Sequence, residues 1–577
     1  MVMARRYRIF VDCPRYTKWR IIDNLTFLDT AIGCINPLSQ KFFNNDIFEF
    51  DEEAANIELV SSPIRSQILS GVLVTEKTYG KYKDKFLYRC MPHDRHLPEF
   101  LVPYSMKTGF QKNHVPVYIC FKYKDWEDKH PRGEIIRTIG PVNILGNFYE
   151  YQLACKNLDI SLKDFTKNAK ERLKHLPTNE IIENIVSKYG ILDRRSHTCY
   201  SIDNNDTVEF DDAFSLWNET KADGKEYQTL SVYISNVSFW MEELDLWSAF
   251  SQRIATIYLP DQKRPMLPTI LSDCICSLKK GEQRIVFTMD ITKCLSEPER
   301  PPEYSFKNSL IIVKENLAYN SWQNNYQAKP VCEEAIKFAA GISKDPIRNG
   351  RDLVYFMMVY FNHMVSCEMI KYKNGIYRNV KSIDCKTEIP KNLPDDVYSY
   401  LKFLKSSVGQ YVCFNDMKHH SHLDLDTYLH ISSPIRRLVD LLNLIQIQEN
   451  LGLFKFTDSA YQFYGKWISK LDYINTTMRS IRKVQSDCNV LAYFEDETNL
   501  EKTYTGYLFD KVRRTDFMYQ YNVYIPELKI TTRLNTLDNY EDYGKYSIKL
   551  FMFKDEYSMR KKIKVQCIEK TVCDVTA

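Results

Sequence analysis

Several features that would assign a protein to a particular class are missing from this sequence of 577 residues. Its 16 cysteines include no CxxC pair, and this excludes the common spacings of zinc ligands. The N-terminal segment lacks the apolar core of a secretory signal. No run approaches the roughly 18 apolar residues that a membrane span needs. We therefore expect no membrane association, reduced cysteines and a cytoplasmic location, with the nucleus as the alternative.

An excess of charge of either sign is also missing. The chain has 78 basic and 74 acidic residues and a net charge of +4, so the total charge does not identify a polyanionic partner. It also has no tract rich in Pro, Gly or Ser. At roughly 150 residues per domain, a chain of this length predicts about three to five domains. Tyr and Phe are abundant, at 39 and 31 residues, which suits base stacking and equally suits small β-barrels.

The pattern of apolar residues changes along the chain. Residues 1–160 and 503–570 read as short strands separated by turn residues, which indicates small barrels. Residues 155–195 show helical periodicity, and Gly190 is expected to end the second helix there. Residues 196–455 mix strands with long helices, and residues 456–497 are again helical. The fold class is therefore multidomain α+β, and the large central region is the candidate catalytic domain.

The run from Asp203 to Asp212 is the most informative segment. It holds five carboxylates, on Asp203, Asp206, Glu209, Asp211 and Asp212. A solvated acidic loop is one interpretation, but the interleaved Ile202, Val208, Phe210 and Ala213 would anchor the segment to a core. A calcium loop fails because its sixth and twelfth positions are Val208 and Phe214. Grouped carboxylates without His or Cys suit Mg²⁺ or Mn²⁺ in phosphodiester cleavage.

A second segment combines arginines with a helix start. Ser433 is expected to cap a helix and Pro434 to occupy its first turn, and this places Arg436 and Arg437 in that turn. Cations there oppose the helix dipole, a cost that a bound phosphate would remove. Ion pairing with nearby carboxylates is the structural alternative.

These residues carry a resemblance to a known family. The run SIDNNDTVEFDDA (201–213) resembles the motif that opens the RNB catalytic domain of the RNase II / RNase R exoribonuclease family. Four further motifs follow in the same order as in that family, at 256–278 (TIYLPDQKRPMLPTILSDCICSL), 309–320 (SLIIVKENLAYN), 374–379 (NGIYRN) and 428–437 (YLHISSPIRR). The layout is most similar to eukaryotic exosome-type members without a PIN domain.

The resemblance implies a domain order. Residues 1–66 would form a shortened cold-shock-like barrel, and residues 67–160 a second cold-shock-like barrel of the OB fold. Residues 161–195 would be a helical connector, residues 196–497 the RNB catalytic domain, and residues 498–577 an S1-like OB barrel.

The same resemblance implies an activity. The chain would hydrolyse single-stranded RNA processively from the 3′ end, with Mg²⁺ or Mn²⁺, and would release nucleoside 5′-monophosphates. Asp203, Glu209 and Asp212 match metal ligands, Asp211 the carboxylate most needed for chemistry, and Arg436 the arginine that grips the scissile phosphate. Tyr258 matches a base-stacking tyrosine, and Arg437 and Arg378 complete the RNA-binding set.

Two departures from the family pattern stand out. Glu209 replaces the usual Asp, and Asn236 replaces an Asp near the expected metal site. An RNA-binding protein without catalysis is therefore the main alternative, and a DNA-directed nuclease is a weaker one. The expected partner is single-stranded RNA. The chain would work as a monomer or within a larger RNA-decay complex.

Overall fold

A computed structural model of the chain describes residues 5–30, 32, 35–51, 56–105, 115–174, 178–380, 389–390, 392–406, 409–421, 423–496, 498–514, 516–554 and 561–570. The chain divides into two compact units. One comprises residues 1–159, 259–261 and 483–577, and the other comprises residues 160–258 and 262–482. The finer domain limits expected from the sequence stay predictions.

The first unit begins with a four-stranded sheet. Its order is β2-β1-β3-β4, formed by β1 (Arg5–Val11), β2 (Trp19–Asp23), β3 (Ile47–Asp51) and β4 (Asn56–Ser61). Alternate residues of β1, namely Tyr7, Ile9 and Val11, are buried, as the two-residue period of a strand requires. Their side chains share one apolar core with residues of β2, of β3 and of the strands that follow this sheet.

A closed barrel follows, in the segment expected to form one. It has the order β5-β6-β7-β9-β8, formed by β5 (Ile68–Tyr82), β6 (Lys85–Pro92), β7 (Phe100–Tyr104), β8 (Val117–Asp125) and β9 (Arg132–Pro141). The short helix α1 (Pro63–Ser66) precedes it, and α2 (Leu145–Cys155) packs on its outside through Tyr151, which stacks on Tyr118 at 4.2 Å between ring centroids. This stacking fixes where the chain leaves the barrel.

The C-terminal strands form a separate five-stranded sheet. The order is β22-β21-β20-β23-β24, formed by β20 (Thr503–Arg513), β21 (Tyr519–Ile525), β22 (Ile530–Thr536), β23 (Lys545–Lys554) and β24 (Lys561–Lys570). The helix α12 (Thr498–Glu501) and the single turn η4 (Pro526–Leu528) complete this part. Its core is its own, with Leu508, Tyr521, Val523 and Ile548 all buried.

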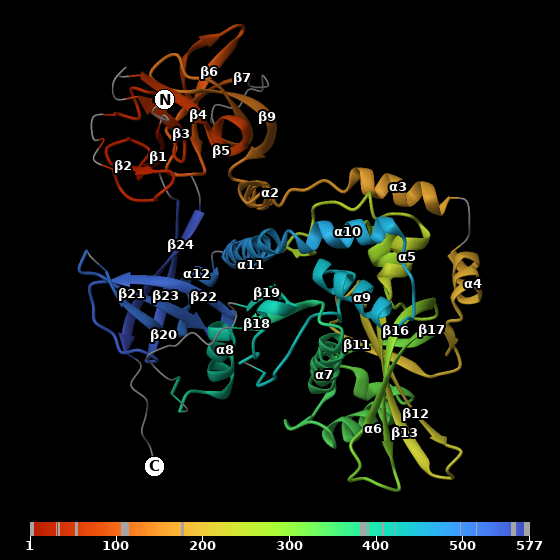
Figure 1. The fold of residues 1–577 in the computed structure, drawn as a ribbon. Helices are drawn as coiled ribbons and strands as arrows, with labels where there is room; N and C mark the ends of the chain where they lie inside the picture. The colour runs from red at the N-terminus through yellow and green to blue at the C-terminus, as the bar shows by residue number, and fades with distance from the viewer. Residues whose placement is uncertain are drawn as a thin grey trace. The chain divides into compact units, whose positions relative to one another are not determined.

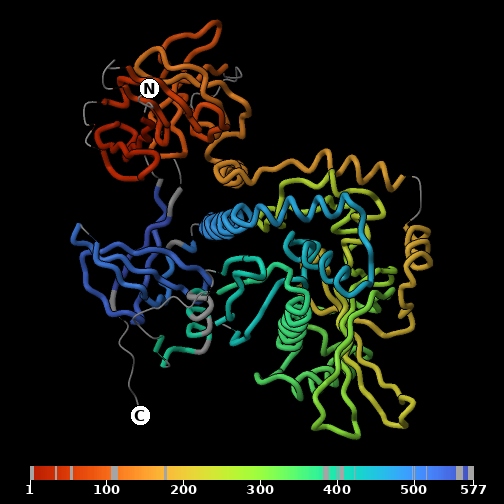
Figure 2. The backbone as a smooth tube through the Cα atoms, viewed as in Figure 1, coloured from red at the N-terminus to blue at the C-terminus, as the bar shows by residue number. Residues whose placement is uncertain are grey.

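The second unit is built on a six-stranded mixed sheet of order β10-β17-β11-β12-β13-β16. The strands are β10 (Leu192–Asp193), β11 (Cys199–Asp203), β12 (Asp212–Thr220), β13 (Glu226–Ser235), β16 (Gln283–Cys294) and β17 (Glu303–Ala318). β17 pairs in parallel with β11 and antiparallel with β16, so segments about 100 residues apart lie side by side (Figure 2). Two-residue strands β14 (Ile257–Tyr258) and β15 (Lys263–Arg264) form a small hairpin.

Helices α6 (Ala328–Ala340), α7 (Gly350–Lys371) and α9 (Leu438–Asn450) share the core of this sheet (Figure 1). Contrary to the expectation that no segment approaches a membrane span, α7 is long and apolar enough by composition to be one. However, Leu353, Met357, Phe361 and Val365 recur every four residues and are fully buried in the sheet core. This is the pattern of a core helix.

The remaining elements of the second unit surround this core. They are α3 (Lys163–Leu173), α4 (Thr178–Tyr189), α5 (Val237–Glu243), η1 (Ile270–Ile275), η2 (Trp322–Asn324), β18 (Ile376–Val380), α8 (Asp395–Ser406), β19 (Gly409–Cys413), η3 (Phe414–Asp416), α10 (Asp458–Ile468) and α11 (Leu471–Tyr493), the last of which continues into the first unit. The helices expected in 155–195 are present. Gly190, at φ 61°, follows the end of α4 as expected.

A buried ion pair joins Arg194, the residue after β10, to Asp290 of β16. Arg194 donates to both carboxylate oxygens of Asp290, at 2.7 and 2.6 Å, and the two side chains are only 4% and 5% exposed. We expect Arg194→Met to lower the free energy of unfolding of this unit by about 3 kcal/mol, because the Asp290 charge stays buried with weaker compensation. Urea denaturation followed by fluorescence measures this loss.

The matched control is Arg195→Met. Arg195 pairs with Asp193 at the surface, so this variant is expected to lose much less stability than Arg194→Met. Equal losses in the two variants would contradict a special role for the buried pair.

Candidate active site

The acidic loop connects two neighbouring strands of the central sheet. Asp203 is the last residue of β11, and Asp212 is the first residue of β12. Ser277 fixes the loop between them, because its hydroxyl accepts from the Phe210 amide at 3.0 Å and donates to the Val208 carbonyl at 2.9 Å. The loop is thus bonded to the segment that carries the YLP and MLP motifs.

The predicted apolar anchors are mostly present. Ile202 and Ala213 are each 1% exposed, and Phe210 packs against a small buried cluster. Val208 is the exception at 44% exposure, so the prediction that it anchors the loop is wrong. Asp206 is exposed. The segment is therefore a structured loop with one solvated carboxylate.

Asp211 is the most strongly held carboxylate of the loop. One of its oxygens accepts from the Ile435 amide at 3.0 Å, and the other accepts from Arg436 Nε at 2.9 Å. The Asp211 side chain is 3% exposed, whereas that of Arg436 is 42% exposed. Burial raises the pKa of Asp211 to about 6, although the Arg436 charge opposes this rise. The structure therefore brings together the two residues predicted to be catalytic.

Asp203 and Asp212 form a second arrangement. Burial raises the pKa of Asp203 to about 6. Burial and then the neighbouring Asp203 and Asp211 charges raise the pKa of Asp212 well above its ordinary value. One oxygen of Asp203, Oδ2, is buried and has no hydrogen-bond partner among the residues that the structure describes. Two close carboxylates and an orphaned oxygen are what a cation would stabilise.

No group of three or more His, Cys, Asp or Glu side chains within the described residues is gathered as a metal-binding set. This does not conflict with a magnesium site. Mg²⁺ is commonly held by one or two protein carboxylates together with waters and substrate phosphates. Asp203 and Asp212 fit that requirement, since their charges are adjacent and uncompensated by a dedicated cation.

Glu209 contacts different partners. Its Oε2 accepts from the Tyr258 hydroxyl at 3.0 Å, and its Oε1 lies 3.1 Å from Lys263 Nζ. Glu209, predicted to be a metal ligand, and Tyr258, predicted to stack on a base, are therefore hydrogen-bonded to each other. Tyr258 is 42% exposed, so it is not a buried core aromatic.

The arginine segment differs from its prediction. Helix α9 begins at Leu438, the segment 434–436 forms a turn and Arg437 forms an isolated β-bridge with Ala255, so Arg436 and Arg437 precede the helix. The reason is backbone pairing. The Thr256 amide donates to the Arg436 carbonyl at 3.0 Å, and the Leu438 amide donates to the Ile254 carbonyl at 2.9 Å. These bonds hold Arg437 in an extended conformation, with φ −137° and ψ 125°.

The remaining predicted RNA-binding residues, Arg378 and Arg437, line one cavity of about 180 Å³. Arg482 of α11 also lines it, together with His430 and Tyr411. Burial and then the adjacent arginines lower the pKa of His430 well below its ordinary value, so it is neutral. Three guanidinium groups around one cavity favour an anionic ligand.

Three residues of the candidate site were not predicted from the sequence, namely Asp440, Arg482 and Lys263. Asp440, fully buried, accepts from the Ser433 amide at 2.8 Å and from Arg437 at 2.7 Å. Its position three residues after Arg437 on a helix start is the only sequence signal for this pair. Arg482 and Lys263 gave no such signal, because their partners are distant along the chain.

Asn236 lies outside the acidic cluster. Its amide donates to Asn308 and Gln448, at 3.0 and 2.8 Å, and its oxygen accepts from Ser238 at 2.6 Å. This fully buried network is neutral and satisfied. The replacement of an Asp at this position is therefore accommodated by its neighbours.

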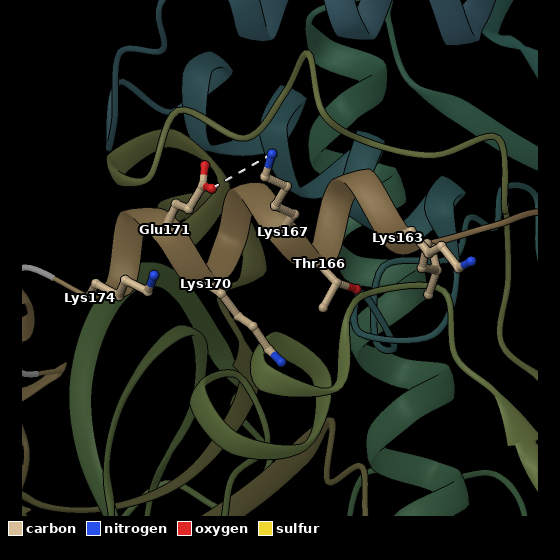
Figure 3. Close-up of a pocket in the computed structure, with 7 residues that line it drawn as sticks. Lys163, Thr166, Lys167, Lys170, Glu171 and Lys174 are labelled. Carbon is tan, nitrogen blue, oxygen red and sulfur yellow. Dashed lines mark ion pairs between the residues drawn. The ribbon is translucent and has the colours of Figure 1, made fainter.

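A wider cavity of about 570 Å³ lies along α3 and carries no acidic cluster (Figure 3). Lys167 and Glu171 pair on one side of the helix, while Lys170 points the other way. Its lining is mostly lysine from this one helix, which is typical of a solvated surface. The acidic loop, in contrast, combines buried charges with fixed partners, and it is the candidate active site.

The fold and this site define a multidomain α+β protein with an RNB domain. The family model of the RNB domain matches residues 192–353, which include the acidic loop. Ribonuclease R of Chlamydia pneumoniae is 25% identical over 43% of this chain and 46% of its own length. That of Thermotoga maritima is 34% identical over 22% of this chain and 18% of its own. The chain spans less than half the length of these curated relatives.

Solved structures share the fold. Mycoplasma genitalium RNase R in complex with ribose-methylated single-stranded RNA matches with a TM-score of 0.68 and 14% identity, covering 97% of this chain and all of that one. Yeast Ssd1, described as a pseudonuclease, matches with a TM-score of 0.58 and 14% identity, covering 87% and 70%. Residues 192–353 therefore form a domain of the RNB family, as the motifs predicted.

The raised pKa values predict how stability depends on pH. Because Asp203 and Asp211 titrate near 6 when folded and near about 3.9 when unfolded, the folded chain binds more protons between these values. Stability therefore falls as pH rises through this window, and the uncharged variant Asp212→Asn should melt about 2–5 °C higher at about pH 8 without divalent cations. At about pH 5 the change should be small.

Thermal unfolding with and without Mg²⁺ checks this. Mg²⁺ is expected to stabilise the wild type at about pH 8 and to have little effect on Asp212→Asn. Asp206→Asn, in the same loop but exposed, is the control and should behave as wild type. A lower melting temperature of Asp212→Asn at the higher pH would contradict the repulsion.

Proposed function

We propose that the chain is a magnesium-dependent 3′-to-5′ exoribonuclease that hydrolyses single-stranded RNA to nucleoside 5′-monophosphates. The observation that carries the proposal is that the Asp211–Arg436 pair lies beside the neighbouring carboxylates of Asp203 and Asp212. The ribonuclease R relatives support the reaction class.

In this proposal Asp203 and Asp212 hold Mg²⁺, which Mn²⁺ could replace. The bound ion would polarise the phosphoryl oxygen and lower the pKa of a bound water. Asp211 accepts a proton from the attacking water, since a carboxylate with a pKa of about 6 is a suitable base near neutral pH. The Ile435 amide and Arg436 hold the Asp211 oxygens in place during that step.

Arg436 has a second task. Its Nε is used by Asp211 and one terminal nitrogen by Ser433, but its side chain is 42% exposed, so donors face solvent beside the carboxylates. We infer that these donors bind the scissile phosphate. Arg378 and Arg437, in the arginine-lined cavity, bind phosphates further along the strand.

Base contacts would come from Tyr258 and from the barrels. Tyr258 is exposed and its hydroxyl is fixed, so its ring can stack on the terminal base. The closed barrel of β5 to β9 has the strand number of an OB fold, and we assign it to that class. The N-terminal sheet would be its shortened counterpart, and the C-terminal sheet an S1-like module.

A catalytically silent RNA-binding protein is the second candidate. The engagement of Glu209 by Tyr258 and Lys263 favours it, because the predicted third acidic ligand is paired with protein groups. Tight RNA binding without cleavage in Mg²⁺ or Mn²⁺ would identify this function. Preferential cleavage of single-stranded DNA of the same sequence would identify a DNA-directed nuclease.

The decisive assay uses RNA labelled at its 5′ end with a single-stranded 3′ tail. The wild type should shorten it to a small limit fragment and release mononucleotides. Asp211→Asn should lower the rate by about 10²–10⁴-fold with RNA binding retained, since it removes the base and keeps the shape. Asp206→Asn, exposed in the same loop, should stay active. Full hydrolysis by pure Asp211→Asn protein would contradict the mechanism.

A second assay separates the ring of Tyr258 from its hydroxyl. Tyr258→Ala should weaken binding of single-stranded RNA by about 1–3 kcal/mol, the usual contribution of one stacked base. Tyr258→Phe keeps the ring and loses only the bond to Glu209, so it should retain most of the affinity. Fluorescence anisotropy with labelled RNA measures both. Equal losses would show that the ring does not stack.

A further inference from the structure

Lys263 is a cation placed against Glu209. The β14–β15 hairpin sets Lys263 directly opposite Tyr258, and the side chains of both reach the same carboxylate. Lys263 Nζ also lies 2.7 Å from Asp273 Oδ1. Tyr258, Lys263, Asp273 and Glu209 thus form one group, which we call the Lys263 cluster.

The cluster is largely shielded from solvent. The Glu209 side chain is 3% exposed, and those of Asp273 and Lys263 are 19% and 23% exposed. Glu209 Oε1 has no hydrogen-bond donor, so the ion pair with Lys263 is its compensation. Glu209 Oε2 is engaged by Tyr258. Both oxygens of Glu209 therefore have partners within the protein, whereas Asp203 keeps an orphaned oxygen.

We propose that Lys263 is a positioning residue that removes Glu209 from the metal-binding set and makes it the support of Tyr258. The ammonium group supplies the positive charge that a metal ion would otherwise supply to Glu209. The longer side chain of Glu, relative to Asp, reaches the Tyr258 hydroxyl. This inference rests on the proposed function only in that it takes Asp203 and Asp212 as the metal ligands.

The first test is thermal unfolding of the full chain without metal. Lys263→Met leaves the buried Glu209 charge unpaired and should lower the melting temperature by about 5 °C. Lys263→Met combined with Glu209→Gln should recover at least half of that loss, because the charge is then absent. Lys263→Arg should restore the wild-type value. A double variant no more stable than Lys263→Met would contradict the proposed pairing of Lys263 with Glu209.

The second test is binding of Mn²⁺, measured from the spectrum of free Mn²⁺ by electron paramagnetic resonance. Glu209→Gln should change the Mn²⁺ affinity by less than about 3-fold, whereas Asp212→Asn should weaken it by about 10-fold or more. In the Lys263→Met background, Glu209 is released, so the added Glu209→Gln change should now weaken binding by about 10-fold. Glu209→Gln as weak as Asp212→Asn in the wild-type background would overturn the proposal.

These outcomes are separable from failure of the proposed function. A chain that shows the expected Mn²⁺ affinities but cleaves no RNA contradicts the exoribonuclease and leaves the Lys263 assignment supported. A chain that cleaves RNA but loses Mn²⁺ in Glu209→Gln contradicts the Lys263 assignment alone. Absence of any Mn²⁺ binding by the wild type overturns both metal assignments.

Discussion

The contact between Asp211 and the segment 435–436 is the constraint on which the site depends. It joins residues more than 220 positions apart and uses both carboxylate oxygens in a buried setting. A buried carboxylate is costly unless its oxygens are satisfied, so the loop and the turn have to meet in this register. The contact of Asp211 with the segment 435–436 therefore sets the position of Asp203 and Asp212 relative to Arg436.

Backbone pairing of the neighbouring residues explains why α9 starts late. The Arg436 carbonyl and the Leu438 amide are bonded to the segment 254–256, so they are not available for a helix that starts at Pro434. The Ile435 amide would be free in either case, and it donates to Asp211. Ser433 and Pro434 carry a valid helix-start pattern, but these tertiary bonds override it. Asp440, in the first turn of α9, accepts from the Ser433 amide and from Arg437, and so bonds the preceding turn to the start of the helix.

Much of the architecture was accessible from the sequence, and the orientation of charged side chains was not. The helices after residue 155, the end of α4 at Gly190 and the family followed from periodicity and ordered motifs. From their motifs, Asp211 and Arg436 could be expected to lie in the same site, but not to form a hydrogen bond with each other. Glu209 pairs with Lys263 because of a hairpin register, and Arg378 shares a cavity with Arg482. No local sequence pattern specifies either arrangement.

The five carboxylates of the acidic loop are accommodated in different ways, and this division gives the site its chemistry. Asp206 is solvated, Asp211 is neutralised by Arg436, and Glu209 is neutralised by Lys263. Within the part of the loop that the structure describes, only Asp203 and Asp212 remain close to each other without a dedicated cation. Burial raises the pKa of both, and the Asp203 and Asp211 charges raise that of Asp212 further. The negative charge left for an exogenous cation is therefore smaller than the count of acidic residues suggests, and it is concentrated where β11 ends and β12 begins.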